Sequence, residues 1–364
     1  MSRFARLCEI SSPTGEEAVV AAAARVELEA FGLEVEEDDA AGPAGAECGN
    51  LLARIPGKKP GFVMFCAHLD TVPHEGPIEV VLEDEVYRSG GETILGADNK
   101  AAVAVLIELA ARHREEPPPI GIELLFTVAE EQGLRGAAAF DVSKLRSHIA
   151  FVFDHATDIG EVITAAPSLH RIEGRFRGVE AHAGLVPEDG RSAIAAAAAA
   201  IAEMDLGRVD EETTANVGLI EGGTSGNVIP GICLVSGEAR SIDPDRTVEV
   251  IMAMSDSMLW AASEHGCEVD LKTEKIFTGY RVPDDSAALA VGEAALAERG
   301  HRPERVSTGG GSDVNAFILN GLDALLLANG TYANHTHDES VPRANLAEML
   351  EVCEAILVEA AARC

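Results

Sequence analysis

The stretch Phe62-Val63-Met64-Phe65-Cys66-Ala67-His68-Leu69-Asp70 joins an apolar run to two side chains of types that bind metals. A short apolar run of this kind is typical of a strand that is buried on both faces of a parallel sheet. His68 and Asp70 follow the run directly, and parallel sheets carry their functional groups at the carboxyl ends of their strands. The stretch therefore predicts an α/β fold with polar side chains gathered at one edge of the sheet.

Side chains of metal-ligand type also stand near the ends of other apolar runs, at Asp98, Glu130, Glu131, Asp154 and His335. Each alone has a simpler explanation, because a lone Asp is a favoured helix N-cap or turn residue. Taken together, they indicate a metal-dependent hydrolase. A carboxylate at Asp98 can bridge two cations roughly 3.5–4 Å apart, an arrangement that recurs in hydrolases.

The adjacent acids Glu130 and Glu131 should repel each other, and a cation or solvent must relieve the repulsion unless one acid becomes protonated. Neighbouring residues of an extended chain point in opposite directions. We therefore expect one carboxylate to bind metal and the other to face the substrate as a general base.

Two histidine-containing segments extend this pattern. In His68-Leu69-Asp70 the carboxylate is close enough in sequence to orient the imidazole and to fix its tautomer. The segment 334–339 contains both His335 and His337, and the spacing alone leaves either one as a candidate ligand.

The composition limits the classes of protein. With 364 residues, 47% of them hydrophobic, the chain is globular and long enough for two domains. Lys and Arg number 28 against 61 Asp and Glu, and the formal net charge of −33 repels phosphate backbones and anionic lipid surfaces. We expect neither nucleic acid nor a membrane as a partner.

The cysteines and the first residues of the chain indicate the cellular compartment in which we expect the protein. Seven cysteines without a Cys-x-x-Cys pair argue against a disulfide framework and favour a reducing, cytoplasmic compartment. The first residues lack the apolar core of a signal peptide, and the apolar tract 193–202 is too short to span a bilayer.

The order of the predicted elements divides the chain into two domains. Residues 1–165 alternate strands with helix, which predicts βαβ units and a mostly parallel sheet. Residues 166–277 follow the order βαββαβ of a ferredoxin-like unit, which we predict to be an inserted lid and dimerisation domain. Residues 278–364 return to helix, strand and helix and complete a discontinuous catalytic domain. We predict strands over 50–55, 62–67, 120–128, 149–153, 170–178, 215–220, 232–240, 267–274 and 324–328, and helices over 100–113, 192–204, 247–265, 286–299 and 346–362.

Several motifs occur in order along nearly the whole chain. They are His-Leu-Asp-Thr-Val at 68–72, Gly-Ala-Asp-Asn-Lys-Ala-Ala at 96–102, Val-Ala-Glu-Glu at 128–131, Phe-Asp at 153–154, Ala-His-Ala-Gly at 181–184, Gly-Gly-Ser-Asp-Val-Asn at 310–315 and His-Thr-His-Asp-Glu at 335–339. In this order they resemble the motifs of the M20 metallopeptidases, in particular the peptidase T-like branch.

The resemblance implies a dinuclear zinc site, although such ligands also accept cobalt or manganese. Asp98 would bridge the two ions, and the remaining ligands would be His68 and Asp154 at one ion and Glu131 and His335 at the other. His335 is preferred to His337 because the family's final His stands four residues before a Glu, as His335 stands before Glu339. The resemblance also implies a cis peptide between residues 98 and 99.

The resemblance implies further roles outside the ligand set. Glu130 would be the general base, and Asp70 would orient a metal-bound imidazole. His182 would stabilise the developing oxyanion in the partner's site across a dimer. Asn227 and Arg240 resemble residues that bind the polar groups and the carboxylate of the substrate, although a surface salt bridge is an alternative for Arg240.

We therefore predict a dinuclear-zinc peptidase that cleaves short peptides with a free terminus, in the manner of a tripeptide aminopeptidase, and that forms a homodimer through the inserted domain. A deacylase or carboxypeptidase acting on N-acyl amino acids is an alternative, because it would share the ligands and the base. A non-catalytic metal-binding scaffold is the alternative from another class, and the presence of Glu130 disfavours it.

Overall fold

The computed structural model describes residues 3–363, which form two compact units. The first unit comprises the chain up to Ala165, Val282–Thr308 and the chain from Ser312 onward. The second unit comprises Ala166–Arg281 with Gly309–Gly311. It therefore ends beyond residue 277, the boundary predicted from the sequence.

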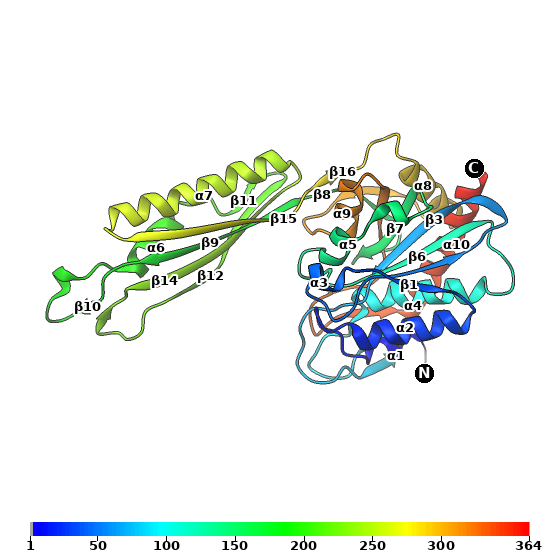
Figure 1. Cartoon of the computed structure of the whole chain (residues 1–364), viewed down its shortest axis with the longest axis horizontal. Coiled ribbons are helices and arrows are strands. Elements are labelled where there is room, and N and C mark those ends of the chain that lie inside the picture. Colours follow the sequence, from blue (N-terminus) through cyan, green and yellow to red (C-terminus); the bar gives the residue numbers. More distant parts are fainter. Residues whose placement is uncertain (1–2, 364) are drawn as a thin grey trace. The chain divides into compact units, whose positions relative to one another are not determined.

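The first unit is built around a mixed, mostly parallel sheet (Figure 1). Its strands run in the order β1-β2-β6-β3-β7-β18-β8, and β17 pairs with β8. The neighbours β6, β3, β7 and β18 are all parallel, whereas β2 is antiparallel to β6. The bounds are β1 Val35–Glu37, β2 Leu51–Ile55, β3 Lys59–His68, β6 Ile120–Thr127, β7 Ile149–His155, β8 Glu161–Ala166, β17 Glu304–Ser307 and β18 Asp323–Ala328.

Helix α4 (Ala97–Arg112) packs on strands β3 and β7 and contacts helices α1, α2 and α10. Its apolar side chains point in all directions and nearly all are buried, which is typical of a helix enclosed in the core. The remaining helices of this unit are α1 Arg3–Cys8, α2 Ala18–Ala30, α3 Ala41–Ala44, α5 Arg135–Ala139, α8 Ala287–Glu298, α9 Asp313–Leu319 and α10 Arg343–Arg363. A small antiparallel sheet consists of β4 Val80–Glu83, β5 Val86–Ser89 and β19 Ser340–Pro342.

The second unit has an antiparallel sheet in the order β11-β12-β14-β9-β15. Helices α6 and α7 pack on it, and Phe176, Val235 and Met258 lie in the buried core between sheet and helices. Each helix begins at a capping side chain, Ser192 for α6 and Asp243 for α7. The bounds are β9 Ser168–Arg177, β10 Ala181–His182, α6 Ala193–Glu203, β11 Gly207–Asp210, β12 Thr213–Gly222, β13 Val228–Ile229, β14 Ile232–Ser241, α7 Pro244–Glu264 and β15 Glu268–Phe277.

Every strand and helix predicted from the sequence is present, with ends shifted by a few residues. Over the described residues, none of the helices combines the length and the apolar composition needed to cross a bilayer. Cys364 lies outside the described residues, and the other cysteines are all free: Cys8, Cys48, Cys66, Cys233, Cys267 and Cys353.

The core beneath the central strands gives a test of packing. Phe151 of β7 is fully buried, and its ring centroid lies 6.0 Å from that of Phe65 of β3. We expect Phe151→Ala to lower the free energy of unfolding by about 3–5 kcal/mol, because it leaves a cavity that neighbouring strands cannot fill. Urea denaturation followed by circular dichroism measures the loss. Leu319→Ala, at a side chain that is 62% exposed, is the control and should change stability by less than about 1 kcal/mol.

Candidate metal centre

The parallel strands bring the predicted ligands to one edge of the sheet. Strand β3 ends at His68, which lies opposite Thr127, the last residue of β6. Strand β7, on the other side of β3, carries Asp154 as its penultimate residue. The carboxyl ends of neighbouring parallel strands meet, as the apolar runs of the sequence predicted.

Asp98 lies between two imidazoles. Its Oδ1 is 3.1 Å from Nε2 of His68, and its Oδ2 is 3.1 Å from Nε2 of His335. Asp154 Oδ1 lies 3.3 Å from the same nitrogen of His68, and Glu131 Oε1 lies 3.0 Å from that of His335. The two oxygens of one carboxylate therefore face two separate sets of donor atoms.

The loop after β6 differs from the extended chain predicted from the sequence. The strand ends at Thr127, and Ala129 adopts a left-handed conformation with φ of 51°. Ligand atoms of Glu130 and Glu131 both lie within 4.8 Å of His68, the former in a group with Asp154. The two acids therefore do not point to opposite sides, because the chain has already left the strand.

The donor set fits divalent cations. Among residues 3–363, no Lys or Arg forms an ion pair with the four carboxylates of Asp98, Glu130, Glu131 and Asp154. Burial raises the pKa of Asp154 to about 7 and raises that of Glu130 well above its usual value. Two ligands bound about 2.1 Å from one tetrahedral zinc ion lie roughly 3.4 Å apart, close to the separations found here.

Asp70 fixes both the imidazole and the acidic loop. Its two carboxylate oxygens accept hydrogen bonds from the backbone N–H groups of Glu130 and Glu131, at 3.0 and 3.1 Å. Nδ1 of His68 lies 3.0 Å from the backbone oxygen of Asp70 and 3.4 Å from its Oδ1. A proton on Nδ1 leaves Nε2 free to bind a cation, which is the tautomer that a metal ligand needs.

Glu339 has a structural role that the sequence does not predict. It is almost fully buried and accepts hydrogen bonds from the backbone N–H groups of Leu95, Gly96 and Asp98, at 2.7, 2.7 and 2.9 Å. These contacts hold the turn that presents the Asp98 carboxylate. The only signal for it in the sequence was its position four residues after His335.

Two further polar residues support the centre. Asn99 follows the cis peptide at Asp98, as the family resemblance implied, and its amide donates to Asp154 Oδ1 at 2.7 Å. Asp313 is buried at the start of α9, where its Oδ2 accepts a hydrogen bond of 2.5 Å from the Thr127 hydroxyl. In the sequence Asp313 stands in a glycine-rich segment, and no local pattern predicts this contact.

The other predicted site residues lie in the second unit. His182 of β10 is exposed, and its strand pairs with β13, next to Asn227. The Ala183 N–H donates to the backbone oxygen of Asn227 at 3.0 Å, so these two predicted residues lie on one small hairpin. Arg240 of β14 forms an ion pair of 2.8 Å with Glu238 and donates to the Gly309 oxygen at 3.1 Å.

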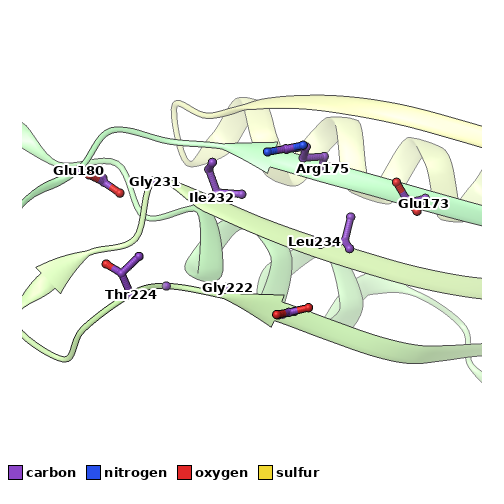
Figure 2. Close-up of a pocket in the computed structure, with 10 residues that line it drawn as sticks. Glu173, Arg175, Glu180, Gly222, Thr224, Gly231, Ile232 and Leu234 are labelled. Carbon is purple, nitrogen blue, oxygen red and sulfur yellow. The ribbon is translucent and has the colours of Figure 1, made fainter.

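The sheet of the second unit carries a hollow of about 430 Å³ (Figure 2). Glu173, Glu180 and Glu221 line it beside a single cation, Arg175. None of the predicted site residues lies in its wall.

Comparisons with known proteins identify a family and similar structures. The family model described as "Peptidase family M20/M25/M40" matches residues 64–359. A Bacillus subtilis protein named uncharacterized protein YqjE is 35% identical over 99% of this chain and 98% of its own. The solved structure of aminopeptidase PepT from Bacillus cereus is 34% identical, has a TM-score of 0.87 and covers 98% of this chain and 96% of its own. That of a Staphylococcus aureus tripeptidase is 31% identical, has a TM-score of 0.93 and covers 100% of this chain and 97% of its own.

The role of Glu339 in presenting Asp98 can be tested directly. We expect Glu339→Ala to weaken zinc binding by about 10–100-fold, because three backbone N–H groups lose their acceptor and the turn at Asp98 loosens. Competition with a chromophoric chelator measures the affinity. Glu298→Ala, an exposed acid on α8, is the control. Unchanged zinc affinity in folded Glu339→Ala would show that the turn holds its shape without this side chain.

Proposed function

The chain belongs to peptidase family M20/M25/M40 and is a hydrolase of peptide bonds; from this premise we propose that it cleaves short peptides from their N-terminus, with tripeptides as the leading substrates, and that it uses two zinc ions. The two solved relatives at 34% and 31% identity are an aminopeptidase and a tripeptidase, which supports this substrate class.

One observation carries the proposal of two ions. The Asp98 carboxylate directs one oxygen toward His68 and the other toward His335, and each imidazole has a second carboxylate beside it. His68 and Asp154 would complete one ion site, and Glu131 and His335 would complete the other. Nitrogen and carboxylate donors of this number suit zinc, although cobalt and manganese accept the same set.

Bound cations would polarise the scissile carbonyl and lower the pKa of an attacking water molecule. Glu130 would accept the proton of that water and return it to the leaving amine, so that one residue serves first as base and then as acid. Its burial beside His68 and Asp154 supports this role. Asp70 would keep the Glu130 backbone and the His68 ring in place for these steps.

The exposed polar residues of the second unit would complete substrate binding. We propose that His182 stabilises the developing oxyanion in the site of a partner subunit and that Asn227 binds polar groups of the peptide. Arg240 would bind the peptide carboxylate with its planar guanidinium group. Its ion pair with Glu238 would then hold that group in position in the absence of substrate.

We also propose a homodimer formed through the second unit and a cytoplasmic location. Helix α7 exposes Met252, Leu259 and Trp260, with exposed fractions of 61%, 50% and 48%. Large apolar side chains gathered on one helix face are typical of an interaction surface. The free cysteines of the described chain suit a reducing compartment.

Turnover and metal dependence test the proposal together. We expect the purified protein to hydrolyse trialanine, to lose this activity when a chelator strips its metal, and to regain it with zinc. Glu130→Gln should bind zinc with wild-type stoichiometry while kcat falls by at least about 10²–10⁴-fold, because the general base is lost. Ninhydrin detection of released amino acid, with metal analysis of the same samples, gives both quantities.

Each result has a contrary outcome. Full activity of metal-free protein would exclude a metal-dependent reaction, and wild-type turnover by Glu130→Gln would exclude this residue as the base. Cleavage of N-acyl amino acids in place of free peptides would favour the deacylase function.

The dimer has its own test. We expect Met252→Glu to convert the dimer to a monomer at micromolar concentration, because a charge is placed in an apolar contact. Light scattering coupled to gel filtration measures the mass. Glu298→Gln, on the first unit, should leave the mass unchanged. A monomeric wild-type protein would rule out the dimer.

A further inference from the structure

Lys100 is a buried cation close to the candidate metal centre. It stands in the first turn of α4, two residues after Asp98, and among residues 3–363 it is the one Lys or Arg that is buried, at 0% exposure. A lysine is almost never fully buried unless its charge is paired. The nearby carboxylates of Asp70, Glu17 and Glu339 attract its ammonium group, but none of them forms an ion pair with it in the described chain.

The ammonium group instead binds Ser12. Nζ of Lys100 donates to the Ser12 Oγ at 2.6 Å, and Ser12 is itself fully buried. A hydroxyl has one proton, and that of Ser12 is donated to the backbone oxygen of Leu69 at 2.9 Å. The lone pairs of the Ser12 oxygen are therefore left to accept from the ammonium group. A hydrogen bond from a charged donor is among the stronger ones in proteins.

Ser12 in turn holds the chain that follows β3 on both sides of Asp70. Its hydroxyl binds the Leu69 oxygen, and its backbone oxygen accepts the Thr71 N–H at 2.9 Å. Leu69 comes directly after His68, the last residue of β3. Lys100 thus connects, through one serine, the helix that starts at the Asp98 turn with the strand end that carries His68.

Resting on the metal-dependent function proposed above, we propose that Lys100 is a positioning residue that, through Ser12, keeps Asp98 and His68 at the separation that a shared cation needs. Oδ1 of Asp98 lies 3.1 Å from Nε2 of His68, although the two residues are 30 apart in sequence. Lys100 touches neither the substrate nor a reacting atom in this role. It acts on the two ligands by fixing the segments that carry them.

A positioning role and a role of charge alone predict opposite effects on zinc affinity. If the ammonium group acted only as a positive charge, its removal would strengthen zinc binding, because two like charges repel. If it positions the ligands, its removal weakens zinc binding, since residues behind the ligands typically contribute 10–100-fold to metal affinity.

Competition for zinc with a chromophoric chelator tests the link. Lys100→Met keeps an unbranched side chain without the ammonium group, and we expect it to bind zinc about tenfold more weakly. Ser12→Ala keeps the ammonium group but breaks the link, and we expect a similar loss. The double variant should bind zinc less than twofold more weakly than either single variant, because all three lack the same connection.

Lys59→Met is the matched control. Lys59 is the first residue of β3, at the opposite end of the strand from His68, and its Nζ donates to the Ala361 oxygen at 2.5 Å. This variant loses a lysine hydrogen bond in the same unit and should keep the zinc affinity within twofold of wild type. Circular dichroism establishes that each variant is folded at the temperature of the assay. Should Lys100→Met not fold, Ser12→Ala decides the question alone.

The contrary results are distinct from a failure of the proposed function. Unchanged or tighter zinc binding by Lys100→Met, wild-type affinity of Ser12→Ala, or losses that add fully in the double variant would each overturn the positioning role. Wild-type protein that binds zinc but leaves trialanine intact would refute the peptidase function, while the zinc affinities of the variants would still decide the role of Lys100. Wild-type protein that binds no zinc would refute the metal centre, and this inference with it.

Discussion

Mutual repulsion among the carboxylates at the end of the parallel strands is the constraint on which this structure depends. Asp98, Glu130, Glu131 and Asp154 converge beside His68, with no Lys or Arg paired to them in the described chain. Burial makes their charges costly, and two imidazoles cannot balance four acids. The fold must therefore hold these groups together against electrostatic repulsion, which divalent cations would relieve when they bind.

Buried carboxylates supply much of that restraint by accepting backbone N–H groups from the loops that carry the ligands. Asp70 holds the loop of Glu130 and Glu131, and Glu339 holds the turn of Asp98. Glu17 accepts from the Ala129 N–H at 3.1 Å, at the residue whose left-handed backbone starts the acidic loop. Each of these three acids thus holds in place a loop that carries metal-ligand side chains from another segment of the chain.

The candidate site residues of the two units differ in exposure. In the first unit His68 and Glu130 are buried, Asp98, Glu131 and Asp154 are partly exposed, and His335 is exposed. In the second unit His182 and Asn227 are exposed on a short hairpin, where they can meet a substrate or a partner subunit. A buried, rigid centre keeps donor atoms in place, whereas exposed residues can adapt to different peptides.

The sequence by itself determined the α/β class, the strands that end at His68 and just before Glu130, and the ordered motifs of the family, because apolar runs and strand ends are local properties of the chain. Only the tertiary structure decided which histidine faces Asp98, how the loop at Ala129 turns both acids toward His68, and that Glu339 holds a turn more than 240 residues away in sequence. Such contacts join segments that are distant along the chain, and no local pattern of residues encodes which of them meet.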